Sequence, residues 1–243
     1  MKAFISTACA AWAACLLASP ASADTYAYMT AENGDYGVLD LTSGAFNLCG
    51  NSGLTLAGLA VGPKGKLFTS SYHTGGPIST IYTVNPANGA LTPVETNLIA
   101  NTEGIASTTA GKIFALDFGL NLYSINPLNA VATLIGSTKV AIGTTVGVST
   151  GSKTLYMSNN ATLYKLNVTT GKATKIGSTG ANTITAMVKI GTTLYAGGQA
   201  QPPNLLTVNP LTGATTQYAQ IMGETSFVYG LVSAPKQTST ACP

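Results

Sequence analysis

Arginine is absent from this sequence, because all eleven basic residues are Lys. Charged residues make up only 8% of the chain, against about 25% in an average soluble protein. Arginine is the usual side chain for bidentate contacts with phosphate and carboxylate groups. Residues 24–243 contain ten Lys and eight acidic residues, so their net charge is near +2. The composition therefore argues against nucleic acid as a partner.

Long apolar segments are also missing, apart from one at the N-terminus. Lys2 gives that segment a positive start, residues 4–17 are apolar or small, and residues 21–23 (Ala-Ser-Ala) match a small-x-small cleavage site. The apolar run is too short to span a bilayer as a helix, and this order is typical of a secretory signal peptide. We expect residues 1–23 to be removed and residues 24–243 to form one exported domain, periplasmic or extracellular. A retained N-terminal anchor is the alternative.

Cysteine and histidine are scarce in residues 24–243. Cys49 and Cys242 are the two Cys left there, and His73 is the single His of the chain. An even number of Cys in an exported protein favours one disulfide, Cys49–Cys242. Two distant Cys and one His do not provide a zinc site. We therefore expect no metal and no cofactor.

One hairpin phrase occurs five times. Its anchor residue is Asp or Asn, with spacings of 45, 41, 41 and 42 residues. The anchor can form an Asx turn, the Pro that often follows presets the turn, and a Gly four residues later supplies a positive φ. In the third copy we expect Asn129 to take the place of that Gly. The copies are YGVLDLTSGAFNLCG (36–50), IYTVNPANGALTPV (81–94), LYSINPLNAVATLIG (122–136), LYKLNVTTGKATKIG (163–177) and LLTVNPLTGATTQYA (205–219).

Two more short strands precede each hairpin, for example EGIAST (103–108) and KIFALD (112–117). Four antiparallel strands in about 42 residues are typical of a propeller blade. The first blade lacks its inner strand, and FVYGLVSAP (227–235) matches an inner strand alone. We therefore predict an all-β fold: a single five-bladed β-propeller, residues 24–243, whose ring is closed by the C-terminal strand. The Cys49–Cys242 bond would lock that closure.

The phrase YMSNN (156–160), followed by TLYKLNVTTGKATKIG, resembles the repeats of YVTN-type and NHL-type bacterial β-propellers, and the resemblance covers essentially all of residues 24–243. It implies the fold rather than one function, because these families include binding proteins, lyases and lactonases. Calcium lactonase-type propellers have a ring of Glu, Asn and Asp on their inner strands, and this sequence does not match that ring. The corresponding positions are Ala57, Glu103, Val146, Thr185 and Tyr229.

The strand pattern also predicts a polarised disc. The Lys face carries the turns between strands 1 and 2 and between strands 3 and 4, with Lys64, Lys66, Lys112, Lys153, Lys172, Lys189 and Lys236. The acidic face carries the longer, varied loops, with Glu32, Asp35, Glu95, Glu103, Asp117 and Glu224, and Lys139 is its exception. Variable loops on a rigid scaffold are where binding usually occurs.

We therefore predict an exported, monomeric binding or scaffolding module, without a membrane span, whose acidic face binds a small molecule, glycan or protein. The candidate ligand-binding residues are Tyr72, His73, Glu103, Asp117, Glu224, Tyr229 and the stretch 199–204. Among the five aligned inner-strand positions only Glu103 is acidic. It would line the mouth of the channel and contact Ca²⁺ or a ligand hydroxyl group weakly.

Two alternatives stay open. One is a propeller lyase or hydrolase that uses His73 as a base with Glu103 or Glu224, although an isolated loop His is more often a solvated polar residue. The other is lectin-like carbohydrate binding, which would require similar aromatic and Asn/Asp pockets in every blade. No catalytic motif is present, so we predict no catalytic residue.

Overall fold

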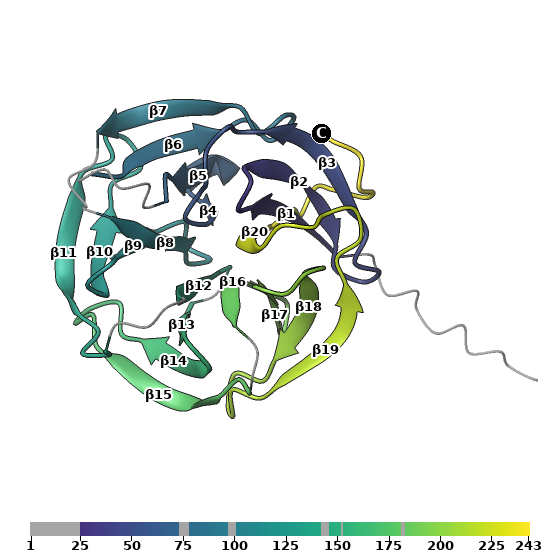
Figure 1. Ribbon diagram of the computed structural model, residues 1–243. Coiled ribbons are helices and arrows are strands. Elements are labelled where there is room, and N and C mark those ends of the chain that lie inside the picture. The colour runs from purple at the N-terminus through teal and green to yellow at the C-terminus, as the bar shows by residue number, and fades with distance from the viewer. Residues whose placement is uncertain (1–24, 73–77, 97–100, 142–145, 152, 181–182) are drawn as a thin grey trace, which may run out of the picture.

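The computed structural model describes residues 25–72, 78–96, 101–141, 146–151, 153–180 and 183–243. Within these ranges the chain forms β-strands and no α-helix; one 3₁₀ segment, η1, covers Pro63–Gly65. The strands make up five units of four, numbered 1 to 5 below, which stand around a common centre (Figure 1). The expected signal peptide lies outside the described residues.

Units 1 to 3 are separate four-stranded antiparallel sheets. Unit 1 has the order β20-β1-β2-β3, and its strands are β20 (Val228–Ser233), β1 (Tyr26–Ala31), β2 (Asp35–Asp40) and β3 (Phe46–Asn51). Unit 2 consists of β4 (Ala60–Val61), β5 (Leu67–Ser70), β6 (Thr80–Val84) and β7 (Leu91–Thr96). Unit 3 consists of β8 (Thr102–Ser107), β9 (Ile113–Asp117), β10 (Asn121–Ile125) and β11 (Ala132–Ser137).

Units 4 and 5 form one eight-stranded sheet, because their inner strands β12 and β16 pair in parallel at three residue pairs. Gly147 permits this approach, since a Cβ there would lie 2.8 Å from the backbone carbon of Thr185. Unit 4 contains β12 (Val146–Thr150), β13 (Leu155–Asn159), β14 (Thr162–Leu166) and β15 (Ala173–Ser178). Unit 5 contains β16 (Ile184–Ile190), β17 (Thr193–Gly198), β18 (Asn204–Val208) and β19 (Thr215–Gln220).

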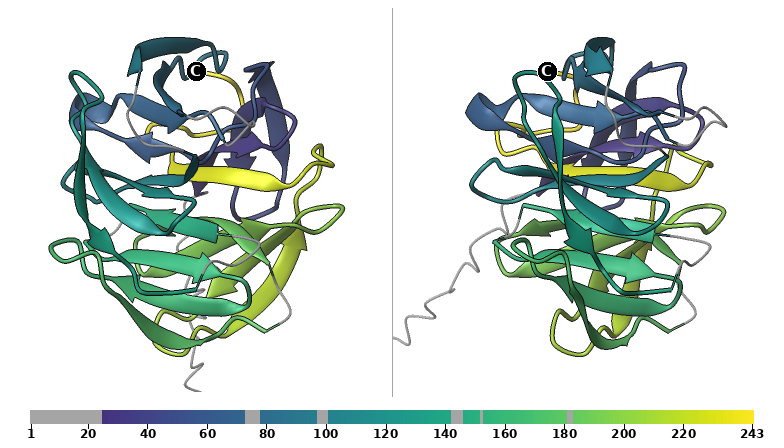
Figure 2. Two further views of the ribbon diagram at one scale, coloured as in Figure 1. Left: turned by 60° about the vertical axis from the view of Figure 1, so that its left-hand side comes forward. Right: turned by 90° about the vertical axis from the view of Figure 1, so that its left-hand side faces the viewer.

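The hydrophobic core lies between neighbouring sheets, which pack face to face (Figure 2). Between units 1 and 5, Met29 and Leu39 belong to the same buried cluster as Val188 and Leu205. Another buried cluster combines side chains of units 2 and 3. Apolar side chains are therefore buried between the units, whereas the outermost strands β3, β15 and β19 keep exposed residues.

The five repeated hairpins begin with the predicted Asx turns. In each of them a side-chain Oδ1 accepts a hydrogen bond from the backbone N–H two residues later, over 2.7 to 3.0 Å. Four of the turns then have a Gly with φ between +71° and +81°. The anchors are Asp40, Asn85, Asn126, Asn167 and Asn209, and the glycines are Gly44, Gly89, Gly171 and Gly213.

The prediction for the third hairpin is wrong by one residue. Ala130, and not Asn129, has the positive φ, at 53°. The turn requires its left-handed residue four positions after the anchor, and that position after Asn126 is Ala130. Asn129 instead accepts a hydrogen bond from the N–H of Val131 over 3.2 Å.

The outermost strand of every unit contains a β-bulge. In all five, the register against the neighbouring strand skips one residue, which the sequence did not predict. A bulge bends and twists an edge strand, which discourages pairing with another chain. The extra residues are Cys49, Val94, Ile135, Ile176 and Tyr218, spaced like the Asx anchors.

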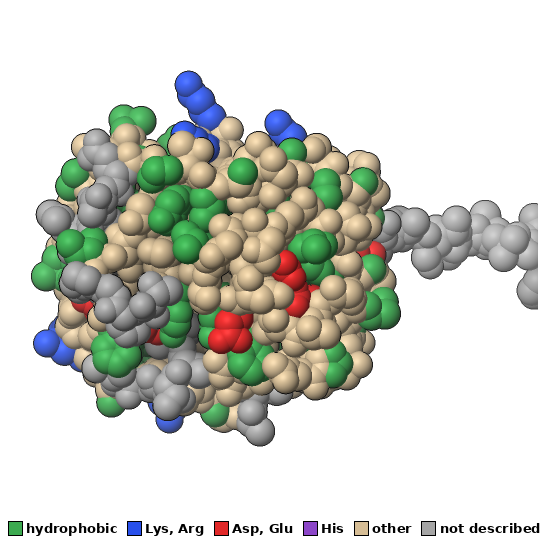
Figure 3. All heavy atoms as spheres, turned by 45° about the horizontal axis from the view of Figure 1, so that its top comes forward, with side chains coloured by type: hydrophobic (Ala, Val, Ile, Leu, Met, Phe, Trp, Pro, Cys, Tyr) green, Lys and Arg blue, Asp and Glu red, His purple; other side chains and the backbone are tan. Residues whose placement is uncertain are grey.

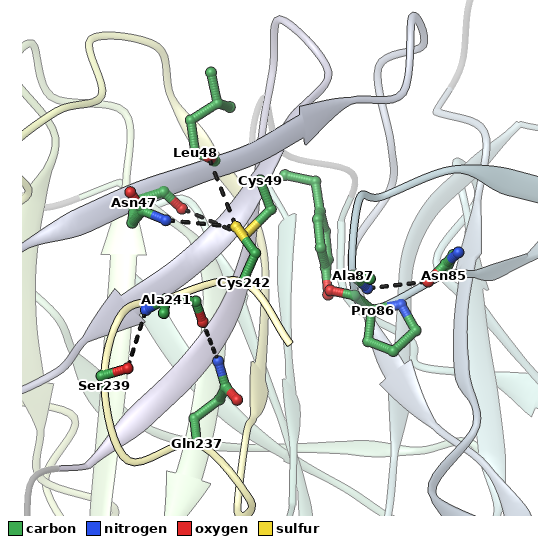
Figure 4. The surroundings of a disulfide bond; sticks show 11 residues. Asn47, Leu48, Cys49, Asn85, Pro86, Ala87, Gln237, Ser239, Ala241 and Cys242 are labelled. Atoms are coloured by element: carbon green, nitrogen blue, oxygen red, sulfur yellow. Dashed lines mark hydrogen bonds between the residues drawn. A yellow bond between two sulfur atoms is a disulfide. The ribbon is translucent and has the colours of Figure 1, made fainter.

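The C-terminal strand joins the N-terminal unit, as predicted: β20 pairs antiparallel with β1. The predicted disulfide is also present, with 5.6 Å between the Cα atoms of Cys49 and Cys242. It attaches the segment after β20 to β3, the outermost strand of the same unit (Figure 4). The first and last strands of the chain are thus held in one sheet by backbone pairing and by a covalent bond.

Candidate functional site

The inner strands of three units begin with a β-bulge that re-aims one side chain. The extra residue is Glu103 in β8, Thr185 in β16 and Tyr229 in β20. These are three of the five inner-strand positions that the sequence aligned. Bulges of this kind occur frequently beside binding and active sites. Here they act at the end of the strands where the acidic loops emerge.

Two of these bulged residues belong to a cluster of tyrosines and carboxylates. The Tyr72 hydroxyl donates a hydrogen bond to Glu103 over 3.2 Å, and the Tyr229 hydroxyl donates one to Glu32 over 3.4 Å. The Tyr72 and Tyr229 ring centroids lie 5.3 Å apart, and Gln199 lies near enough to Tyr229 to act on the pKa of its hydroxyl, which it lowers. We name Glu32, Tyr72, Glu103 and Tyr229 the mouth cluster.

Residues of units 1, 2 and 3 converge in the mouth cluster because their loops are bonded to one another. Glu32 follows β1, and its N–H donates to the carbonyl of Phe227 just before β20. The hydroxyl of Thr55 donates to the carbonyl of Glu32, while the carbonyl of Thr55 accepts from the N–H of Tyr72. These contacts join the loops of units 1 and 2, and unit 3 is attached to them where the N–H of Ile105 donates to the carbonyl of Ala57.

Burial and negative charge both act on the two hydroxyl groups. Burial, and then the neighbouring Glu103, raise the pKa of Tyr72. Burial, and then Glu32, raise the pKa of Tyr229. Both phenols are therefore neutral hydrogen-bond donors at physiological pH. They offer ligands an aromatic surface next to carboxylate oxygens.

A small cavity lies beneath the mouth cluster, on the common centre of the five units. Tyr229 borders it, and all five inner strands or the segments leading into them line it, with a cavity volume of about 10 Å³. That volume is about what a single water molecule requires. Glycines keep the strands close here, because a Cβ at Gly104 would lie 2.8 Å from a Val148 methyl carbon. A ligand larger than a few atoms must therefore bind at the mouth.

Asp117 and Glu224 do not join the mouth cluster. Asp117 accepts hydrogen bonds from the backbone and side chain of Asn121 and from the hydroxyl of Tyr123, so it holds the turn between β9 and β10. Glu224 is buried, and its Oε1 accepts from the N–H groups of Thr225 and Ser226. The carboxylate of Asp117 and the Oε1 of Glu224 are therefore used by their own loops, whereas the Oε2 of Glu224 is buried without a hydrogen-bond partner.

The remaining candidates have different outcomes. His73 lies outside the described residues. Of the stretch 199–204, Gln199 reaches the mouth cluster through Tyr229. Glu32 was not selected from the sequence, although its loop was placed on the acidic face. The signal that could have identified it is its position directly after the strand that pairs with β20.

The two ends of the strands carry opposite charges. The strand bounds place Lys64, Lys66, Lys112, Lys153, Lys172, Lys189 and Lys236 at one end, which we call the lysine end. They place Glu32, Asp35, Glu95, Glu103, Asp117 and Glu224 at the other, which we call the acidic end. Figure 3 shows acidic side chains near the middle of the displayed face and Lys side chains at its outline.

Within the described ranges no three His, Cys, Asp or Glu side chains are grouped closely enough to hold a metal ion. The same part of the chain has no helix with the length and apolar character that crossing a membrane requires.

Comparison with known proteins relates the chain to others through its fold alone. No protein-family model and no curated protein sequence matches it. A chain from the crystal structure of a nidogen–laminin complex is 11% identical, with 88% of this chain and 99% of that chain covered and a TM-score of 0.54. A Bacteroides caccae protein of unknown function is also 11% identical, with 88% and 100% covered and a TM-score of 0.55. These similarities show a propeller-type, all-β fold.

Proposed function

We propose that the chain is an exported binding module, built as a single five-bladed propeller that β20 closes. Its ligand binds at the acidic end, on the mouth cluster. The five repeats, the pairing of β20 with β1 and the disulfide support the closed ring. The disulfide also supports export, because such bonds persist in oxidising compartments. One of the similar structures is a protein–protein complex, so this architecture is compatible with a binding role.

The observation that carries the proposal is the placement of Glu103 and Tyr229 in β-bulges. A regular strand would keep each side chain in the alternating pattern, whereas a bulge costs ladder hydrogen bonds and re-aims one residue. Both re-aimed residues belong to the mouth cluster, one through Tyr72 and one through Glu32. Such a cost is expected where a surface is shaped for a ligand.

The chemistry of the mouth cluster favours a ligand with ammonium or hydroxyl groups. Two carboxylates attract cations and accept hydrogen bonds from sugar hydroxyls. The paired rings of Tyr72 and Tyr229 provide a flat surface for cation–π contacts or for the apolar face of a sugar ring. The narrow cavity below limits the ligand to the surface of the mouth.

A thermal-shift screen tests the proposal with polyamines, choline, oligosaccharides and Ca²⁺ as probes, because a ligand of the native state raises its stability. We expect a probe that stabilises the wild type and fails to stabilise the Glu32→Gln/Glu103→Gln variant. The control, Lys112→Gln/Lys153→Gln, should respond like the wild type. If a probe stabilises the Glu32→Gln/Glu103→Gln variant but not the Lys112→Gln/Lys153→Gln variant, the binding site lies at the lysine end and the proposal is contradicted.

A further inference from the structure

The two most exposed large apolar side chains of the described structure are Leu128 and Leu211, at 87% and 85% exposure. They occupy the same position in two repeats, directly after Asn126-Pro127 and Asn209-Pro210. Both lie in turns between the third and fourth strands of a unit, so both emerge at the lysine end. Each of the two tips therefore presents an almost fully exposed aliphatic side chain at the lysine end.

Both turns hold their Leu rigidly. The N–H of each Leu donates to the Oδ1 of the preceding Asn over 2.9 Å. The turn of unit 5 also rests on unit 4, because a Cβ at Gly177 would collide with the carbonyl of Thr212. Both Leu side chains therefore project from turns whose backbone is hydrogen-bonded to the Asn anchor.

Lysines surround these two tips on the same end of the molecule. Units 3, 4 and 5, which are neighbours in Figure 1, contribute Lys112, Lys153, Lys172 and Lys189. The turns that carry them pack together: Gly151 donates to the carbonyl of Ser107 over 3.0 Å, and a Cβ on Gly151 would lie 2.6 Å from the carbonyl of Lys189.

Asp40 is the single acidic side chain at the lysine end among the described residues, and it is engaged by its own turn. Among the described side chains, this end therefore carries seven Lys against one carboxylate.

We propose that the lysine end docks on an anionic lipid surface, with Leu128 and Leu211 inserted at the level of the headgroups. Peripheral membrane binding combines apolar side chains at the headgroup boundary with Lys residues that attract anionic lipids. A polyanionic polysaccharide would use the lysines and leave the two leucines in water, so the lipid surface explains both observations. The proposal is independent of the mouth cluster, which lies at the opposite end and would face away from the membrane.

Vesicle co-sedimentation tests this docking, with phosphatidylcholine vesicles and with vesicles that also contain phosphatidylglycerol. We expect wild-type protein to bind only the anionic vesicles, and less at high salt. A Lys near an anionic surface contributes about fivefold in affinity. Lys112→Gln/Lys153→Gln/Lys172→Gln should therefore weaken binding on the order of 100-fold. The control is a pair of single variants: Lys139→Gln, at the acidic end, should bind nearly like the wild type, whereas Lys112→Gln should lose about fivefold.

The leucines need their own pair of variants. Leu128→Ser/Leu211→Ser should lose about tenfold or more in vesicle affinity, whereas Leu48→Ser/Leu134→Ser, at exposed positions on outermost strands, should not. All variants have the same residues 1–24, so any difference in vesicle affinity among them comes from the substituted side chains. Equal loss in test and control variants would overturn the proposal. Binding to heparin without binding to vesicles would also overturn it and indicate an anionic polysaccharide instead.

Discussion

At the residue scale, one polar side chain per repeat sets the geometry of each hairpin. The Asx oxygen satisfies a backbone N–H that the turn would otherwise leave to water, and the residue four positions later adopts a positive φ. Ala130 shows that the turn dictates the conformation even where the sequence offers no Gly. The hairpin is therefore encoded by position relative to the anchor.

Asn167 offers a direct test of the anchor. Its Oδ1 accepts hydrogen bonds from the N–H groups of Thr169 and Thr170, over 2.9 and 3.1 Å. Asn167→Ala should lower the free energy of unfolding by about 1 kcal/mol, measured by urea denaturation. Asn167→Asp keeps the acceptor, as Asp40 does in the first repeat, and should stay close to the wild type. Equal losses in both variants would show that the side-chain oxygen is unimportant.

Several tyrosines should make the protein sensitive to alkali. Burial raises the pKa of Tyr36, Tyr72 and Tyr218 in the folded chain above their ordinary value of about 10. The stabilisation that follows is fully present below pH 10, where the phenols are neutral in both states. It is lost as the pH rises from there towards the higher pKa of the folded state, because the unfolded chain ionises first.

The corresponding measurement is tyrosinate absorbance with circular dichroism between about pH 9 and 13. We expect part of the tyrosinate signal to appear together with loss of β-structure. Complete ionisation of all tyrosines near pH 10, with the fold intact, would contradict the burial that the structure shows.

Among the strands, β20 makes contacts with more than one unit. It pairs with β1, it supplies Tyr229 to the mouth cluster, and its Leu231 carbonyl accepts a hydrogen bond from Thr150 of unit 4 over 2.8 Å. Without it, β1 becomes an open edge with unpaired N–H and C=O groups, which favours aggregation.

Deletion of residues 225–243 should accordingly yield insoluble protein, assessed by size-exclusion chromatography of the soluble fraction. The matched control is Cys49→Ser/Cys242→Ser, which removes the covalent link but keeps β20, and should remain soluble. A soluble, cooperatively unfolding deletion variant would contradict closure by this strand.

At the scale of the whole molecule, the disulfide connects residues 193 positions apart. The chain-entropy model gives a stabilisation of up to about 5 kcal/mol for a loop of this length. Cys49→Ser/Cys242→Ser should lower the free energy of unfolding by an amount up to that value, measured by denaturation of both proteins without reductant. Intact mass of the wild type should rise by two hydrogens on reduction, whereas two free thiols in the isolated protein would exclude the bond.

The periodic features of this protein follow from its amino-acid sequence. Five Asx anchors at near-constant spacing predict hairpins from local hydrogen bonding and turn chemistry, and the unmatched C-terminal strand identifies the partner that β1 lacks. The same periodicity predicts which end of the strands each charged residue occupies. These features depend on short segments, so local hydrogen bonding, turn chemistry and strand alternation are sufficient to predict them.

The details of the candidate site depend on tertiary contacts. The bulges at Glu103 and Tyr229, and those in all five outermost strands, depend on how neighbouring strands pair, which strand propensity does not specify. Tyr72 meets Glu103, and Tyr229 meets Glu32, because three units converge at the mouth. Asp117 has a carboxylate, as a ligand-binding acidic residue would, but that carboxylate accepts a hydrogen bond within its own turn. A carboxylate's role is set by the groups around it, and those groups come from distant parts of the chain.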